Sequence, residues 1–317
     1  MSKTIEVGHI KTKAGYKNFG WIKVGETPIR DISIPVGVVN GSETGPTLVV
    51  TAGWHACEYP GIDSAIRIYN EVDPKDLRGK IITCPIQHPV AFETATPYVS
   101  PIDVNRFHPV PRMGALSSNI TKFVNEKIRL LGDCCFDLHG GDVPEDYIPN
   151  VIFTRWGIET LDKKTETLAD LFPVKYMWVR SARTDEERSP LVDKGIPSMV
   201  IEAGGLGFCN EDDVKINLTG LLNVMKYLDM IDGKLEQTPK KKIFEKSLTI
   251  YTKHGGLFYP KVKPGDELSA GQVIGEVKDI LWNTKEEIIM PEKGVMRIVF
   301  PKHVVNADEE VFRVWLY

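Results

Sequence analysis

The chain has 317 residues, which is enough for two domains that each bury a substantial core. Hydrophobic residues make up 42% and charged residues 26%, as in ordinary globular proteins, and the formal net charge of −4 gives no overall attraction to nucleic acid or to an anionic membrane. The sequence begins without the apolar segment of a secretory signal and contains no run long enough to span a bilayer. Its five cysteines are irregularly spaced, which argues against a disulfide framework. We therefore expect a cytoplasmic protein.

Apolar runs and helical patterns alternate through the first three quarters of the chain. Apolar runs bounded by turn residues predict strands at 21–24, 32–39, 47–51, 81–86, 134–138, 151–154 and 198–203. Apolar residues repeated every three or four positions predict helices at 59–72, 119–131, 158–171 and 212–230. The proline-rich stretch at 87–101 is expected to be irregular. The alternation favours an α/β fold with a mixed, largely parallel sheet flanked by helices.

The composition changes near the C-terminus. Residues 232–242 form a polar, lysine-rich segment that is typical of a linker. Beyond it the helical pattern disappears, and short apolar runs are separated by turn sequences such as Pro264-Gly265-Asp266. We therefore predict an α/β domain at 1–235 and a small all-β domain at 243–317.

The first candidate ligands lie where a predicted strand passes into a predicted helix. His55 and Glu58 are three residues apart at this junction. In open α/β sheets, ligands bind beyond the carboxyl ends of the strands, which is where these two side chains would lie. The spacing alone decides nothing, because His139 and Asp142 share it and a hydrogen-bonded loop histidine would explain His55 equally well.

Two other polar residues also end apolar runs, namely His139 and Glu202. Carboxylates are rarely buried unless a partner holds them, so Glu202 at the end of a predicted buried strand is informative. Two histidines and one glutamate form a typical ligand set of a hydrolytic zinc site, with one position left for water. We therefore predict one zinc ion per chain, bound by His55, Glu58 and His139.

The remaining polar residues supply the other parts of a hydrolytic site. Glu202 is the spare carboxylate, and it can take a proton from water and pass it to a leaving nitrogen. Asn105 and Arg106 lie in a loop after another predicted strand, and an arginine and an amide suit a substrate carboxylate.

Four motifs in order resemble those of the succinylglutamate desuccinylase/aspartoacylase family, within the wider zinc carboxypeptidase-like group. They are H-x-x-E at 55–58, D-x-N-R-F at 103–107, D-L-H-G-G at 137–141 and I-E-A-G-G at 201–205. The resemblance covers about residues 45–317. It implies the same zinc ligands, general base and carboxylate-binding pair, and hydrolysis of the amide bond of a small N-acylated amino acid or related compound. It also implies that the C-terminal domain is a lipoyl-like barrel-sandwich module.

The sequence departs from the family pattern in two places. An additional arginine usually precedes the N-R pair, but residues 95–97 read Ala-Thr-Pro here, and Arg112 is a candidate replacement. Ala56 follows the first histidine where the family normally has glycine. Arg183 and Arg188 are further candidates for substrate binding, although solvated charges in a polar loop would explain them as well.

Three more residues lie near the predicted site in the sequence. Asp137 is expected either to support a ligand from behind or to be structural. Cys57 stands between two proposed ligands, but no base is placed beside it by the sequence, so we expect it to be structural. His88 precedes a proline and is expected to be a loop residue.

Three alternatives compete with a deacylase. A zinc carboxypeptidase acting on peptide C-termini would need the same residues. A carrier module would need a modifiable lysine in a tight hairpin, and neither Lys278 nor Lys285 has such a setting. A metal-free relative is disfavoured because all three ligands and the base are present. We expect a small carboxylate-bearing substrate, no nucleic-acid or membrane partner, and leave a homo-oligomer open.

Overall fold

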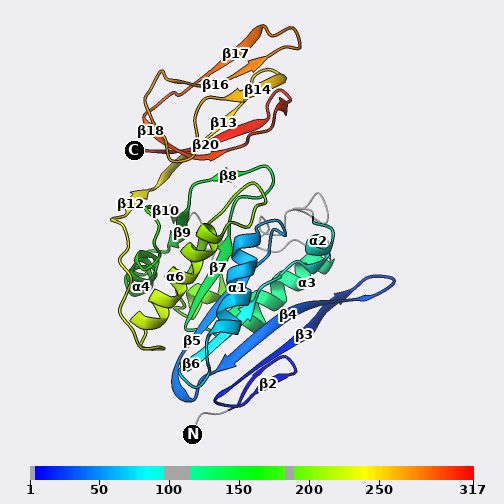
Figure 1. Cartoon of the computed structure of the whole chain (residues 1–317), viewed down its shortest axis with the longest axis vertical. Helices are drawn as coiled ribbons and strands as arrows, with labels where there is room; N and C mark the ends of the chain where they lie inside the picture. The colour runs from blue at the N-terminus through cyan, green and yellow to red at the C-terminus, as the bar shows by residue number, and fades with distance from the viewer. Residues whose placement is uncertain (1–3, 96–114, 183–188) are drawn as a thin grey trace.

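The computed structural model describes residues 4–95, 115–182 and 189–317. A large α/β unit contains a central sheet, and a smaller unit made of strands lies at one end of it (Figure 1). None of the described helices is both long enough and apolar enough to cross a membrane.

The central sheet has nine strands and is mixed but mostly parallel. In spatial order the strands are β12 (Lys242–Phe244), β10 (Tyr176–Ser181), β9 (Asn150–Arg155), β11 (Ser198–Glu202), β7 (Cys134–His139), β5 (Glu43–Ala52), β6 (Arg78–Cys84), β4 (Asp31–Asn40) and β3 (Tyr16–Glu26). Only the pairs β9–β11, β6–β4 and β4–β3 are antiparallel. The expected fold class is confirmed.

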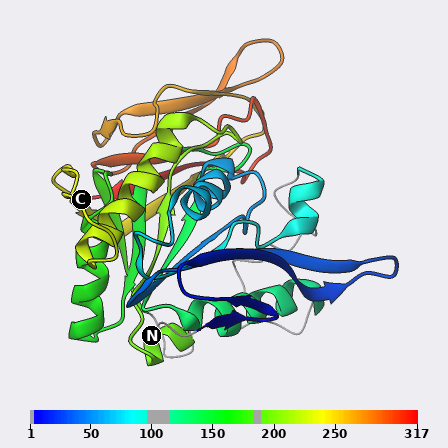
Figure 2. The same cartoon turned by 60° about the horizontal axis from the view of Figure 1, so that its bottom comes forward.

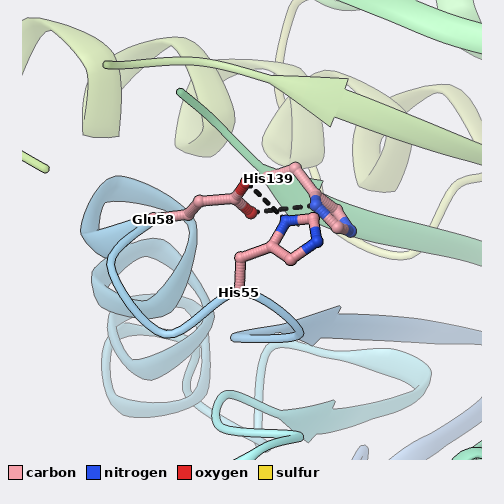
Figure 3. A group of neighbouring side chains, drawn as sticks. All are labelled: His55, Glu58 and His139. Carbon is pink, nitrogen blue, oxygen red and sulfur yellow. Dashed lines mark hydrogen bonds and ion pairs between the residues drawn. The ribbon is translucent and has the colours of Figure 1, made fainter. Parts of the chain in front are cut away.

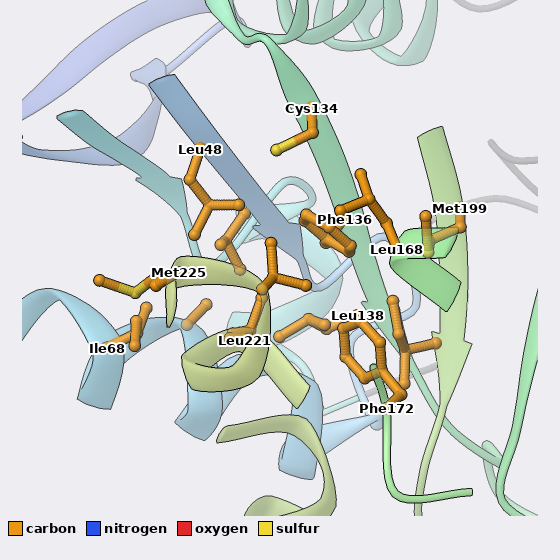
Figure 4. Packing of buried hydrophobic residues seen from close by; sticks show 14 of the residues in the cluster. Leu48, Ile68, Cys134, Phe136, Leu138, Leu168, Phe172, Met199, Leu221 and Met225 are labelled. Carbon is orange, nitrogen blue, oxygen red and sulfur yellow. The ribbon is translucent and has the colours of Figure 1, made fainter. Parts of the chain in front are cut away.

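Helices cover both faces of this sheet. One face packs against α1 (Tyr59–Glu71), α4 (Glu159–Asp170) and α6 (Glu211–Tyr227) (Figure 4). The other packs against α3 (Ala115–Phe123), the π-helical turn that follows it (Val124–Ile128), α5 (Pro190–Asp193) and the small hairpin of β1 (Ile5–Val7) and β2 (Ile10–Thr12). Figure 1 and Figure 2 both show the β3–β4 hairpin projecting from the side of the α/β unit.

The central strands are buried on both sides, which explains their unbroken apolar sequences. In β5, Leu48 and Val50 face the cluster under α1 and α6, whereas Val49 faces the opposite cluster. Strands covered on both faces read as continuous hydrophobic runs rather than as alternating ones. Each fully buried side chain of this size contributes roughly 1.5–3 kcal/mol relative to exposure. These strands therefore form a rigid base for the residues at their ends.

The structure corrects three expectations about local structure. A short helix, α2 (Pro89–Glu93), lies inside the stretch that was expected to be irregular. The helix expected at 119–131 is α-helical only to Phe123, continues as the π turn and ends as a 3₁₀ turn, Arg129–Leu131. Strand β10 was not predicted, although its first four residues are all apolar, and it pairs with β9 along its whole length.

The C-terminal unit consists of two antiparallel sheets. One contains β13 (Lys246–Tyr251), β20 (Glu310–Leu316), β18 (Gly294–Val299) and β15 (Glu267–Leu268). The other contains β17 (Thr284–Ile289), β16 (Val273–Lys278), β14 (Gly256–Pro260) and β19 (Val304–Val305). Between them lies an apolar core that includes Phe258 and Phe312.

Two short strands connect the two units. Strand β12, at the start of the predicted second domain, pairs in parallel with β10 and so belongs to the central sheet. Strand β8 (Asp146–Tyr147), which follows β7 in the chain, pairs with β18 and so extends a C-terminal sheet, with Tyr147 opposite Ile298. Figure 1 shows β8 between the two units. The C-terminal unit is therefore joined to the loop that leaves the end of β7.

Candidate metal centre

The four residues predicted for catalysis come together at one edge of the central sheet. His55 follows β5, Glu58 is the N-cap residue of α1, and His139 and Glu202 are the last residues of β7 and β11. Strands β5, β7 and β11 run parallel to one another, so their carboxyl ends meet at this edge. The β7–β11 register places Glu202 directly beside His139.

His55, Glu58 and His139 form a compact cluster in which the two imidazoles lie side by side and Glu58 contacts both of them (Figure 3). One potential ligand atom from each residue lies within 4.8 Å of the others. The Nδ1 atom of His55 is 2.7 Å from Oε1 of Glu58, and Nδ1 of His139 is 2.9 Å from Oε2. The described residues contain no other cluster of three such groups at this spacing.

The electrostatics of the cluster favour an added positive charge. Glu58 is 2% exposed, and although burial alone would raise its pKa, His55 and His139 hold the pKa of this carboxyl below its usual value. Burial would likewise lower the pKa of His139, but Glu58 and Asp137 raise it to about 10. Both shifts show carboxylates attracting cationic charge into a buried site.

The donor set also fits a metal ion. Oε2 of Glu58 is within ion-pair distance of His139, yet this buried oxygen has no hydrogen-bond partner among the described residues. A buried carboxylate oxygen left in this way is costly unless a cation neutralises it. Two imidazole nitrogens and one carboxylate oxygen are the protein ligands of many hydrolytic zinc sites. His55, Glu58 and His139 would hold such an ion.

Asp137 supports the cluster from behind. Its Oδ2 atom is 3.4 Å from Nε2 of His139 and also contacts the guanidinium of Arg129. Its Oδ1 atom accepts hydrogen bonds from Thr51 Oγ1 at 2.7 Å and from Gln87 Nε2 at 3.0 Å. Burial opposes ionisation, but Arg129 and His139 hold the pKa of Asp137 well below its usual range. A carboxylate on the far ring nitrogen fixes the orientation of a histidine ligand.

Glu202 lies beside the cluster without belonging to it. It is 8% exposed, and Oε1 lies 3.5 Å from the hydroxyl of Tyr147. Burial is the largest influence on this carboxyl and, with Glu58, raises the pKa of Glu202 to about 7, against the opposing effect of His139. A carboxyl group with a pKa near neutrality can both accept and return a proton.

Other residues named from the sequence have different outcomes. Asn105, Arg106, Arg112, Arg183 and Arg188 lie outside the described residues. Cys57 is buried, and burial raises the pKa of its thiol, which disfavours a thiolate nucleophile. His88 lies in the loop before α2, as expected, where it is the N-cap residue of that helix and is 1% exposed.

Comparison with known proteins identifies the family. A sequence model of the succinylglutamate desuccinylase/aspartoacylase catalytic domain matches residues 44–228. The chain is 26% identical to an N-alpha-acetyl-L-2,4-diaminobutyric acid deacetylase from Halomonas elongata over 78% of this chain and 75% of the relative. The chain belongs to the succinylglutamate desuccinylase/aspartoacylase family, whose members include amide-bond deacylases.

Solved structures share the fold over almost the whole chain. A succinylglutamate desuccinylase/aspartoacylase from Rhodobacter sphaeroides gives a TM-score of 0.82 at 23% identity, covering 95% of each chain. A product-bound ectoine utilization protein, EutE from Ruegeria pomeroyi, gives 0.84 at 17% identity, again covering 95% of each chain. The C-terminal unit is therefore part of the shared architecture.

Arg129→Met should destabilise the protein by about 3–5 kcal/mol, because it leaves the buried Asp137 carboxylate without its cation. Urea-induced unfolding of the purified variants measures this free energy. The control is Arg155→Met, which removes a partly exposed pair with Glu245 and should cost at most about 1 kcal/mol. Equal losses in the two variants would contradict the structural role given to Arg129.

Proposed function

We propose that this chain is a zinc-dependent deacylase that hydrolyses the amide bond of a small N-acylated amino acid. The observation that carries the proposal is the cluster of His55, Glu58 and His139, with Glu202 beside it, at the carboxyl edge of the sheet. Membership of a family that includes amide-bond deacylases supports the reaction class. The nitrogen and oxygen donors of the cluster support zinc.

The chain's own residues would divide the chemistry between them. When bound, zinc would make a water molecule more acidic and polarise the acyl carbonyl. Glu202 would accept the proton of the attacking water and then deliver it to the amide nitrogen as the carbon–nitrogen bond breaks. Burial raises the pKa of this carboxyl above its usual value in the metal-free site, which favours a group that can hold the proton between the two transfers. Asp137 would keep His139 oriented during this cycle.

The substrate's carboxylate would be bound outside this cluster. Asn105 and Arg106 are proposed for this role, with Arg183 and Arg188 as further candidates, because guanidinium groups bind carboxylates with two parallel hydrogen bonds. The relative from Halomonas elongata is named for an acetylated amino acid, which supports a small substrate over a peptide. No nucleic acid or membrane is required by the proposed reaction.

The first test is metal content. The purified protein should contain about one zinc ion per chain by elemental analysis, and His55→Ala, Glu58→Ala or His139→Ala should lower the occupancy. Free zinc at 100 times its dissociation constant should stabilise the folded metal-free protein by about 2.7 kcal/mol. The control, His254→Ala, removes an exposed histidine of the C-terminal unit and should keep the zinc. A protein that neither contains nor binds zinc would exclude this proposal.

The second test concerns the base. Glu202→Gln keeps the shape of the side chain but cannot accept the proton, so kcat should fall by roughly 10²–10⁴-fold. Zinc content should not change, because Glu202 is not a ligand. Turnover of N-acyl amino acids and zinc content are measured on the same preparation, with Glu159→Gln on the exposed start of α4 as the control. Loss of zinc in Glu202→Gln would make this residue a ligand instead.

The third test concerns the substrate carboxylate. Arg106→Ala should raise KM more than Arg106→Lys, because lysine keeps the charge but loses the planar pair of donors. The difference in KM between these two variants should disappear with a substrate whose carboxylate is replaced by a carboxamide. Initial rates over a panel of N-acyl amino acids and short peptides give these constants and separate a deacylase from a carboxypeptidase. Unchanged kinetics in Arg106→Ala would remove this residue from the site.

A further inference from the structure

A buried arginine lies where the C-terminal unit meets the catalytic unit. Arg297, in β18, is 2% exposed. Its guanidinium carbon lies 3.7 Å from the ring centre of Trp178 in β10, and 5.1 Å and 5.6 Å from those of Tyr147 and Trp315. Aromatic faces stabilise a desolvated guanidinium. No described carboxylate lies within ion-pair distance of Arg297, so its charge is held by rings and by one hydroxyl group.

That hydroxyl belongs to Tyr147, and its hydrogen bonds have a definite direction. Arg297 donates a hydrogen bond from Nη2 to the Tyr147 oxygen. A guanidinium only donates and never accepts, so the oxygen must be the acceptor and the O–H hydrogen is free to point elsewhere. Glu202 Oε1 lies 3.5 Å away and can accept it. Burial raises the pKa of Tyr147, which keeps that hydrogen in place.

The two oxygens of Glu202 are consequently not equivalent. Oε1 receives the Tyr147 hydroxyl, whereas Oε2 is buried and has no hydrogen-bond partner among the described residues. An oxygen that already accepts a hydrogen bond is a poorer proton acceptor than a free one. The arrangement therefore anchors the carboxylate through Oε1 and leaves Oε2 as the atom that takes the proton of water.

We propose that Arg297 is a positioning residue for the reaction and that it acts on Glu202 through the Tyr147 hydroxyl. This inference rests on the proposed function, because it assigns to Glu202 the role of general base. Arg297 touches neither Glu202 nor the metal cluster within hydrogen-bond distance. Its contribution is to set the direction of one hydroxyl group, and so the orientation of the catalytic carboxylate.

The backbone fixes this chain of contacts at both ends. Strands β8 and β18 pair with Tyr147 opposite Ile298, and the Ile148 amide donates a 3.1 Å hydrogen bond to the Arg297 carbonyl. Glu202 is held by its pairing with His139. Because both ends belong to sheets, the hydroxyl has little freedom to move. Rigid support of this kind is what places a catalytic group to within a fraction of an ångström.

A simpler role must be separated from this one, namely that Arg297 only joins the two units. A joining residue would affect stability and every kinetic constant together. A positioning residue would lower kcat while leaving KM and zinc content nearly unchanged, and its effect would depend on the Tyr147 hydroxyl. The matched control is Ile298→Val, which loosens packing at the same joint but leaves the hydroxyl and both its partners intact.

The experiment is a double-mutant cycle on zinc-loaded, full-length protein with one N-acyl amino acid. Arg297→Met and Tyr147→Phe should each lower kcat by roughly 10–100-fold, the range for residues that support a catalytic group from behind. The kcat of the double variant should be no lower than that of the slower single variant. Once either Arg297 or the Tyr147 hydroxyl is removed, the other can no longer act on Glu202, so its removal should cost nothing more. Arg297→Lys should recover part of the loss, and Ile298→Val should keep kcat.

Additive losses in the double variant, or an equal loss of kcat in Ile298→Val, would overturn the proposal. A wild-type protein that binds zinc but turns over no N-acyl amino acid would instead count against the proposed function. The contacts can then be tested without a substrate, by the ¹⁹F resonance of 3-fluorotyrosine introduced at position 147. That resonance should shift in both Arg297→Met and Glu202→Gln but not in Ile298→Val. If it failed to shift in either of the first two variants, the proposed contact of Arg297 with Glu202 through Tyr147 would be overturned.

Discussion

Buried negative charge at one edge of the sheet is the constraint on which this structure depends. Glu58, Asp137 and Glu202 are each less than 10% exposed, and the parallel strands bring them to the same edge. Burying a carboxylate is unfavourable unless hydrogen bonds or opposite charges compensate it. Each of the three has a different form of compensation, and the differences decide what each one can do.

Asp137 has a full set of partners, so it stays ionised and structural. Its Oδ2 atom contacts Arg129 and the His139 ring, and its Oδ1 atom accepts hydrogen bonds from Thr51 and Gln87. Glu58 has only the two imidazoles, one beside each carboxylate oxygen, so its negative charge is available to a cation that the three residues share. Glu202 has one hydroxyl, and its pKa of about 7 leaves it able to exchange a proton. In the proposed reaction the same functional group would therefore act as a support, a metal ligand and a base, according to what surrounds it.

The sequence alone predicted those site residues whose positions follow from the pattern of strands. His55, His139 and Glu202 end apolar runs, and parallel strands bring such ends together whatever the details of the loops. Arg129 was not predicted, because it reaches Asp137 from a 3₁₀ turn after a π turn, where α-helical periodicity no longer predicts which way a side chain faces. The contact between Tyr147 and Arg297 could not be predicted from the sequence either. Strand β8 has only two residues, too few for any periodic pattern.

The pairing of β8 with β18 also sets the order in which the site can be completed during synthesis. The α/β unit ends with β12 (Lys242–Phe244), and Arg297 in β18 follows it, so the α/β unit emerges from the ribosome before the strand that pairs with β8. At about 5–20 residues per second, the interval between them lasts roughly 3–10 s. During that time the nascent chain can bury its central sheet and assemble its histidines, while Tyr147 still lacks its partner. In the proposed role of Arg297, the orientation of Glu202 would therefore be completed only after β18 has been made, in a chain whose α/β unit can already be folded.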